Sequence, residues 1–78
     1  MEPAVKVLYF GPAREISGTA AEEITACDTV SLRSRLLEKY PLIGALPFVL
    51  ALNCRILKED CSLKDNDVVA ILPPFEGG

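Results

Sequence analysis

The sequence contains no histidine and no tryptophan. Without an imidazole, the chain cannot supply a histidine general base, a histidine metal ligand or a Ser-His-Asp arrangement. It also has no G-x-G-x-x-G or Walker-type glycine loop. Glu22 and Glu23 are adjacent, and neighbours on a strand point to opposite faces, so they make no convincing acid/base pair. An active site built from side chains is therefore not expected.

The chain has no excess of positive charge. Its 8 Lys and Arg face 11 Asp and Glu, and the net charge of -3 opposes binding to a phosphate backbone. The start, Met1-Glu2-Pro3, lacks the basic and apolar regions of a signal peptide. The longest nearly apolar stretch, residues 42–52, is far shorter than the ~20 residues that span a bilayer. We therefore expect no nucleic-acid partner, no membrane association and a cytosolic protein.

Cysteine is scarce as well. Cys27, Cys54 and Cys61 form an odd set without a C-x-x-C pair. One such chain can build neither a closed disulfide framework nor a four-cysteine metal or iron-sulfur site. We therefore predict no metal site and interpret the three cysteines as reduced, small hydrophobic residues.

What the sequence does have is apolar content, since 50% of its 78 residues are hydrophobic. A chain of this length forms one compact domain around a single core. Two strongly apolar segments, residues 4–10 and 68–72, are predicted to be strands at the centre of a sheet. Residues 19–27 are predicted to return as a second strand, although Ala20-Ala21-Glu22-Glu23 is equally compatible with a helix. Further segments are predicted from composition: a strand at 48–52, a loop at 11–18, a turn at 53–55, a short return strand at 56–57, and a turn at 64–67.

One amphipathic helix is predicted over residues 32–40. Leu32, Leu36 and Tyr40 recur every four residues, with Leu37 beside them, and this spacing gives a single buried stripe. Pro41 ends the helix, because proline lacks the amide proton that the helix needs. Three residues ahead of it are candidate N-caps, namely Asp28, Thr29 and Ser31.

The order of these elements indicates the fold class. Both end strands favour the sheet centre, so they are expected to pair side by side, with the helix covering one face. The result is an α+β fold of the β-grasp (ubiquitin-like) type, with a mixed sheet and one main helix packed on one face. We predict a β-grasp domain over residues 1–72 and an extended C-terminal tail over residues 73–78.

The tail is the candidate site. Pro73 and Pro74 favour an extended exit, and six extended residues reach roughly 20 Å from the body. The final glycines have no side chains and fit a narrow channel. The carboxylate of Gly78 is therefore the candidate reactive group, and Gly77, Phe75, Pro74 and Pro73 are candidate partner-binding residues.

Two segments resemble the MoaD family, the sulfur-carrier small subunits of molybdopterin synthase. Residues 9–18 read Tyr-Phe-Gly-Pro-Ala-Arg-Glu-Ile-Ser-Gly and are similar to the family's Phe-Ala-x-x-Arg-Glu-x-x-Gly. Residues 65–74 with the terminal Gly77-Gly78 resemble the family's closing pattern. Gly11 stands where the family often has alanine. Within the first segment, the resemblance singles out Phe10, Arg14 and Glu15.

The resemblance implies a reaction cycle for the C-terminus. An ATP-dependent adenylyltransferase and sulfurtransferase would adenylate Gly78 and convert it to a thiocarboxylate. Docked in the large subunit of molybdopterin synthase, the tail would then give its sulfur to the cyclic pyranopterin precursor to form the dithiolene. The resemblance implies no permanently bound cofactor, catalytic residues on the large subunit of a heterotetramer, and no enzyme activity of this chain on its own.

Three other interpretations stay open from the residues. A ThiS-like carrier for thiazole synthesis, or a carrier for tRNA thiolation, shares the tail chemistry and differs in its acceptor. A ubiquitin-type modifier would end in an isopeptide bond to lysine. A plain β-grasp interaction domain would have an inert tail. The Arg-Glu-x-x-Gly loop favours the molybdopterin carrier over all three.

Overall fold

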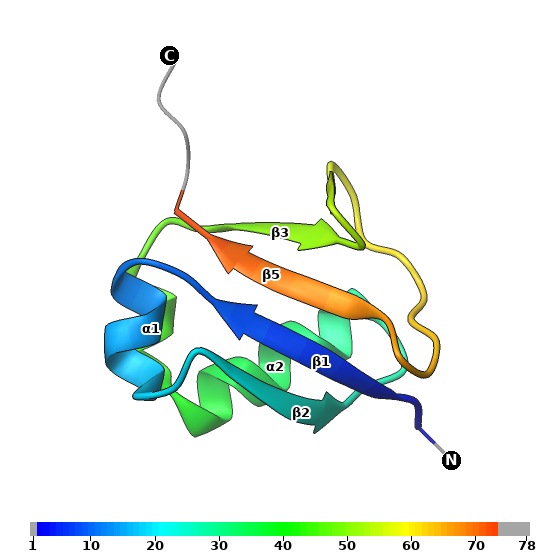
Figure 1. The fold of residues 1–78 in the computed structure, drawn as a ribbon, viewed down its shortest axis with the longest axis horizontal. Helices are drawn as coiled ribbons and strands as arrows, with labels where there is room; N and C mark the ends of the chain where they lie inside the picture. Colours follow the sequence, from blue (N-terminus) through cyan, green and yellow to red (C-terminus); the bar gives the residue numbers. More distant parts are fainter. Residues whose placement is uncertain (1, 74–78) are drawn as a thin grey trace.

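The computed structural model of the chain describes residues 2–73. These residues form a mixed sheet with one long helix on one face (Figure 1), so the predicted β-grasp fold is confirmed. The elements in chain order are β1 (Ala4–Tyr9), α1 (Pro12–Ser17), β2 (Ala21–Thr25), α2 (Thr29–Lys39), the 3-10 helix η1 (Pro41–Ala45), β3 (Val49–Leu52), β4 (Arg55–Ile56) and β5 (Val68–Leu72).

The two most apolar strands lie side by side at the centre of the sheet, as predicted. The strand order is β2-β1-β5-β3-β4, and β1 and β5 run parallel, with Leu8 opposite Ala70. The other neighbours are antiparallel. Parallel neighbours need a long crossover connection, and the chain between β1 and β5 includes α2, which covers one face.

Helix α2 begins with a side-chain cap. The carboxylate of Asp28 accepts a hydrogen bond from the amide of Ser31 at 2.7 Å, so Asp28 is the N-cap among the predicted candidates. The helix therefore starts three residues before the predicted residue 32. Leu32 and Leu36 are fully buried, whereas Leu37 is 41% exposed. The predicted stripe is narrower than expected, because Leu37 lies on its outer edge.

The core lies between the sheet and α2. Alternate residues of the central strands point into it, which is the period-two pattern of a sheet with one covered face. The fully or nearly fully buried apolar residues are Val5, Val7, Tyr9, Ala13, Ala26, Leu32, Leu36, Ile43, Leu50, Ala51, Leu63, Val69 and Ile71. Their close packing fixes the position of β5 in the sheet.

The predicted loop at residues 11–18 is wrong, because most of it is the short helix α1. Pro12 stands at the start of this helix, where its missing amide proton costs nothing. Gly18 ends the helix with a left-handed φ of 74° and donates its amide to the carbonyl of Arg14. Ala13 anchors the helix in the core. A proline just inside and a glycine just past the segment are the sequence signals of this helix.

A two-residue hairpin turn joins β3 to β4. Asn53 and Cys54 have φ values of 47° and 73°, and positive φ at both central positions matches the right-handed twist of the strands. The turn is thus one residue shorter than predicted, and β4 starts at Arg55, one residue before the predicted return strand. The predicted turn at residues 64–67 is confirmed, with Asn66 at a φ of 72°.

The segment between β4 and β5 is hydrogen-bonded to the start of α2. The buried hydroxyl of Thr29 donates to Asp60 Oδ1 at 2.7 Å and accepts from the amide of Cys61 at 3.0 Å. Asp28 and Ser62 form an antiparallel bridge beside it. Thr29 therefore holds this irregular segment against the helix.

The cysteines are not the packed hydrophobic residues that the sequence suggested. Cys27 and Cys54 are exposed, and Cys61 is half-buried. The thiol of Cys27 lies 3.6 Å from the hydroxyl of Ser31, and Cys54 occupies the hairpin turn. All three thiols are free. Within residues 2–73, no helix is long and apolar enough to cross a membrane.

Candidate functional site

The candidate site starts where β5 ends. This strand is paired on both sides, with β1 and with β3, and its side chains Val69 and Ile71 are fully buried. Leu72, its last residue, is opposite Val49 of β3. Pro73 follows and is the last described residue. The tail is therefore rooted in a central strand that is paired on both sides.

The root of the tail contacts the turn between β1 and α1. The amide of Phe10 donates to the carbonyl of Ile71 at 3.3 Å, which extends the pairing of β1 and β5 by one residue. Gly11 has a φ of +57°, and a Cβ placed on it would lie 3.8 Å from Cγ of Pro73. The turn and the tail root are thus in van der Waals range. Figure 1 shows α1 at this same end of the sheet.

An apolar groove opens beside the tail root. It has a volume of about 120 Å³, and every lining residue is apolar. Three segments far apart in sequence form it, and we call it the tail-root groove: Phe10, Pro12, Ala13, Leu46, Pro47, Phe48, Ile71, Leu72 and Pro73. Phe10 on its wall is 45% exposed. The chain thus presents an open apolar hollow at the point where the tail departs.

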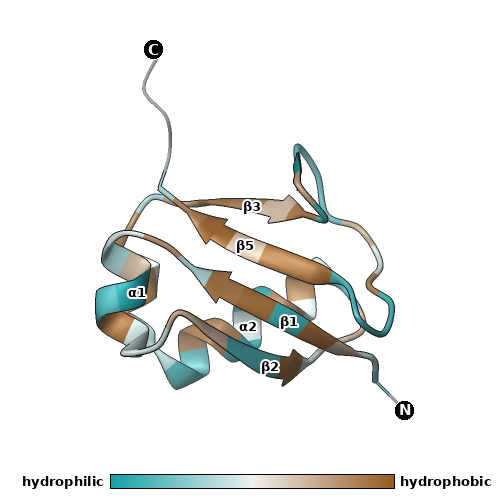
Figure 2. Cartoon of the chain, viewed as in Figure 1, coloured by the Kyte–Doolittle hydropathy of each residue, from teal (hydrophilic) through white to brown (hydrophobic). Residues whose placement is uncertain are grey.

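The sheet face that α2 does not cover is also largely apolar. Leu8, Ala70 and Leu72 are half-buried and alternate with residues that point into the core. Figure 2 shows hydrophobic colouring along most of β1, β5 and β3, interrupted in β1 by a hydrophilic segment. An apolar sheet face of this kind is typical of a surface that a partner covers.

The first-loop residues singled out by sequence lie on and beside this groove. Phe10 lines it. Arg14 and Glu15 are exposed on α1, next to the groove residues Pro12 and Ala13. Within residues 2–73, neither charged side chain makes an ion pair or a hydrogen bond through its charged group. Both charged side chains are thus exposed on α1, the helix whose residues Pro12 and Ala13 line the groove.

Of the predicted tail residues, Pro73 lies in the groove wall. The other four fall outside the described residues: Pro74, Phe75, Gly77 and Gly78. Their assigned roles as partner-binding residues and reactive terminus therefore stay predictions. Among residues 2–73, no three His, Cys, Asp or Glu side chains gather to hold a metal ion.

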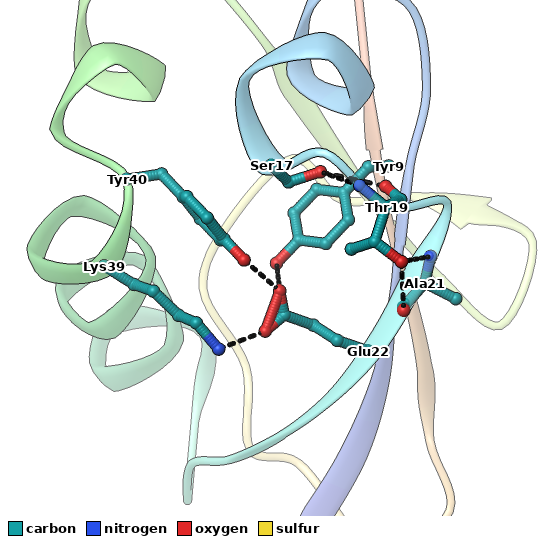
Figure 3. A network of polar contacts seen from close by, with 7 residues as sticks. All are labelled: Tyr9, Ser17, Thr19, Ala21, Glu22, Lys39 and Tyr40. Atoms are coloured by element: carbon teal, nitrogen blue, oxygen red, sulfur yellow. Dashed lines mark hydrogen bonds and ion pairs between the residues drawn. The ribbon is translucent and has the colours of Figure 1, made fainter.

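The structure reveals one polar cluster that sequence reasoning missed, centred on Glu22 (Figure 3). The hydroxyl of Tyr9 donates to Glu22 Oε2 at 3.0 Å, and the hydroxyl of Tyr40 donates to the same oxygen. The ammonium of Lys39 pairs with Glu22 Oε1. The rings of Tyr9 and Tyr40 pack edge to face, with centroids 5.8 Å apart. This cluster ties β1 and β2 to the end of α2.

The electrostatics of the cluster keep Glu22 ionised. Burial alone raises the pKa of Glu22, but hydrogen bonds from Lys39, Tyr40 and Tyr9 outweigh burial and hold its pKa below the usual range. Burial, and then the bond to Glu22, raise the pKa of Tyr9. The bond to Glu22 is also the main cause of the raised pKa of Tyr40. At neutral pH the cluster is therefore one carboxylate with protonated partners. Its role is to hold β1, β2 and the end of α2 together, and it does not form an acid/base pair.

Comparison with known proteins identifies the family. The sequence profile of the ThiS family matches residues 7–78, which include the tail as well as the domain. The chain belongs to the ThiS family. A curated relative, the molybdopterin synthase sulfur carrier subunit of Chlamydomonas reinhardtii, is 33% identical over 81 residues, covering 95% of this chain and 98% of the relative.

Solved structures agree with this assignment. A chain in the protein-protein complex of subunits 1 and 2 of the molybdopterin-converting factor from Helicobacter pylori 26695 is 36% identical, with a TM-score of 0.73 over 96% of this chain and 99% of that one. The small archaeal modifier protein 1 of Methanosarcina acetivorans has a TM-score of 0.86 at 24% identity, covering 100% of this chain and 99% of that one. The second likeness shows the fold alone. The predicted resemblance to the MoaD family of ubiquitin-like sulfur carriers is confirmed.

Proposed function

We propose that this chain is the sulfur carrier subunit of a molybdopterin synthase and that the carboxylate of Gly78 carries the sulfur. One observation supports this most strongly. The chain matches a named sulfur carrier subunit over nearly its whole length, and the family profile runs through to Gly78. The geometry of the tail root supports the same proposal, because a fixed central strand and an apolar surface lead directly into the tail.

The chemistry follows from the weakness of a free carboxylate as an electrophile. Adenylation by an ATP-dependent activating enzyme gives Gly78 a good leaving group. The outer sulfur of a persulfide donor displaces AMP, and a thiol then cleaves the remaining sulfur-sulfur bond to leave a thiocarboxylate. The resulting sulfur is anionic and nucleophilic, as thiolates are. It is then transferred to the cyclic pyranopterin precursor to build the dithiolene.

In this proposal the chain is a substrate-bearing subunit and not a catalyst. The catalytic residues are assigned to the large subunit, and ATP is used only by the activating enzyme. The H. pylori relative was solved as a complex of two subunits of the converting factor, which supports the large subunit as partner.

The contribution of the fold is positional. The root at Pro73 is held by β5, and Pro74 next to it restricts the backbone to extended geometry. A tail that leaves a rigid strand in one direction loses less conformational freedom when it enters a narrow channel. The glycines at the end fit where a side chain would collide.

Mass spectrometry tests this proposal. Incubation with the activating enzyme, ATP and a sulfur donor should raise the intact mass by the difference between one sulfur and one oxygen, and fragmentation should place it on Gly78. Gly77→Val or deletion of Gly78 should abolish pterin sulfuration, whereas Glu76→Ala, a change in the same tail, should retain it. If Gly78 never gains sulfur where a known carrier does, or if an unprocessed C-terminal extension still transfers sulfur, the proposal is wrong.

A further inference from the structure

Strand β2 forms one edge of the sheet and has β1 as its neighbour on the other side (Figure 1). The amide of Tyr9 donates to the carbonyl of Ala20, and the amide of Ala26 donates to the carbonyl of Pro3. Because hydrogen-bonded pairs alternate along an antiparallel ladder, the even-numbered residues of β2 are the ones that bond to β1. The amides and carbonyls of its odd-numbered residues therefore point away from the sheet.

One end of this edge is closed and the other is open. The hydroxyl of Thr19 donates to the carbonyl of Ala21 at 3.0 Å and accepts from the amide of Ala21 at 3.5 Å (Figure 3). Within residues 2–73, the amides and carbonyls of Glu23 and Thr25 have no hydrogen-bond partner. Proline, lysine and bulges commonly protect an edge strand, and β2 has none of them. The half of β2 at Glu23 and Thr25, which we call the open edge, thus offers two donors and two acceptors to a further strand.

A groove runs between the open edge and helix α2. It has a volume of about 450 Å³ and is lined by Glu23, Ile24, Thr25, Arg35, Glu38 and Lys39. Ile24 is its one apolar side chain and lies half-buried against the core. An extended segment laid against β2 would place every second side chain in this groove, because side chains alternate between the two faces of a strand. The side chain that comes to lie beside Ile24 should therefore be aliphatic.

The charges around the groove indicate the charge of the occupant. Its two basic residues, Arg35 and Lys39, each pair with a carboxylate from another part of the chain. Its two acidic residues, Glu23 and Glu38, are exposed and form no ion pair within residues 2–73, although Lys6 stands opposite Glu23 on β1. The unpaired charge is therefore negative and favours a basic segment. Two copies of this chain joined along β2 would instead bring four such carboxylates to one interface, which is unfavourable.

We propose that the open edge binds an extended segment of another protein in which aliphatic residues alternate with lysine or arginine. The segment adds to the sheet as a further strand through main-chain hydrogen bonds to Glu23 and Thr25, which is a common mode of peptide recognition. Its aliphatic side chains lie in the groove against Ile24. Its basic side chains, on the other face, lie beside Glu23, and Glu38 at the rim of the groove adds to the attraction.

This site is separate from the root of the tail. Strand β1 lies between β2 and β5, and Glu23 is level with Val68, the first residue of β5. The strand runs four more residues from there to Leu72, which is roughly 13 Å. A protein bound at the open edge would therefore hold the domain and leave the tail root uncovered.

NMR with a synthetic peptide tests the main-chain pairing. The probe is acetyl-Lys-Ile-Lys-Val-Lys-amide, titrated into the full chain labelled with nitrogen-15. Binding should shift the amide signals of Glu23, Ile24 and Thr25, and it should slow hydrogen exchange at Glu23 and Thr25 about tenfold or more. A peptide with the same side chains but N-methylated backbone amides should not bind. The peptide with glutamate in place of lysine should not bind either.

Substitutions in the strand provide matched controls. Thr25→Pro removes an outward amide without removing a bond to β1, whereas Thr25→Val keeps that amide. Only the proline variant should therefore weaken peptide binding, by about five- to tenfold. Glu23→Lys should weaken it as well, because it reverses a charge at the open edge, whereas Glu59→Lys makes the same change at an exposed residue outside the groove and should not.

Several results would overturn the proposal. These are unshifted amides at Glu23 and Thr25, equal binding of the N-methylated peptide, and equal binding by the two Thr25 variants. A glutamate peptide that binds as tightly as the lysine peptide would overturn the proposed ligand. If sedimentation shows a dimer in which both amides are protected without peptide, a second copy occupies the edge and the proposal is wrong. None of these measurements depends on Gly78, so the sulfur carrier proposal is tested separately.

Discussion

Replacing Glu22 by glutamine isolates the charge of the carboxylate that joins β1, β2 and α2. The two side chains have nearly the same shape, so packing is retained while the negative charge is lost. The neighbouring Glu23 provides a matched control, because it lies on the same strand but is exposed and takes no part in the cluster. The comparison of Glu22→Gln with Glu23→Gln therefore reports on the cluster alone.

The expected magnitude follows from the two tyrosine contacts. A hydrogen bond to a charged group contributes about 1.5 to 3 kcal/mol, against about 0.5 to 1.5 kcal/mol for a neutral one. Tyr9 and Tyr40 both donate to Glu22, and the Tyr9 side chain is almost fully buried. Loss of the charge should therefore lower the free energy of unfolding by about 1 to 2 kcal/mol. Lys39 is 54% exposed, and its screened ion pair is left out of this sum.

Thermal and urea unfolding, followed by circular dichroism at pH 7, measure this loss. A destabilisation of 1 kcal/mol lowers Tm by roughly 4 to 8 °C in a domain of this size. Glu23→Gln should stay within about 0.5 kcal/mol of the original chain. A double-mutant cycle of Glu22→Gln with Tyr40→Phe then separates the Tyr40 contact from the rest.

The pH dependence gives an independent check of the same reasoning. The pKa of Glu22 in the folded chain lies below its unfolded value of about 4.3, so its stabilisation is complete above that value and is lost as pH falls through the folded pKa. The gap between the original chain and Glu22→Gln should therefore be full at pH 7 and shrink in acid. Equal unfolding of the Glu22 and Glu23 variants at pH 7, or a gap that persists undiminished at pH 2, would refute the assignment.

Two further predictions concern the backbone turn and the buried hydroxyl. Cys54→Gly should raise the free energy of unfolding by about 0.5 to 1 kcal/mol, because Cys54 holds a φ of 73° that glycine adopts without strain; a urea midpoint at or below that of the original chain would count against this. Thr29→Val keeps the shape of a buried side chain but leaves the amide of Cys61 without its acceptor, so it should cost about 1 to 3 kcal/mol, and hydrogen exchange at Cys61 should accelerate. An unchanged exchange rate at Cys61 would show that the hydroxyl does not hold that segment.

The parts of the fold that sequence predicted well are those with a strong local signal. Residues 4–10 and 68–72 are apolar runs without a breaker, and their pairing at the sheet centre follows from their content. The four-residue spacing of Leu32 and Leu36 predicts helix α2. The predicted start, residue 32, lies three residues after the observed one, because the capping residue Asp28 defines the first turn and the apolar spacing does not.

The parts that sequence missed either lack a hydrophobic pattern or depend on contacts between distant residues. Helix α1 has a single buried residue, Ala13, so hydrophobic spacing gives no signal for it, although Pro12 and Gly18 mark its ends. The Glu22 cluster joins residues from two strands and a helix, and nothing in the local sequence distinguishes Glu22 from Glu23. Such side-chain networks are visible only once the elements are packed together.

The candidate site also has one part that the local sequence predicts and one part that it does not. The terminal glycines and the pair of prolines are local features, and the family match covers them. The tail-root groove is not a local feature, because Phe10, Leu46 and Leu72 come from three separate parts of the chain. Phe10 was singled out only through a family resemblance, and no spacing rule links it to the other two.

The pairing of β5 has a mechanical consequence for any force that acts on the end of this strand. A pull on Pro73 along the axis of β5 acts parallel to its neighbours β1 and β3, so the hydrogen bonds on both sides are loaded together in shear. A strand at the sheet edge, pulled sideways, would instead lose its bonds one after another. The domain is therefore built to resist unfolding when a force acts on the end of its C-terminal strand.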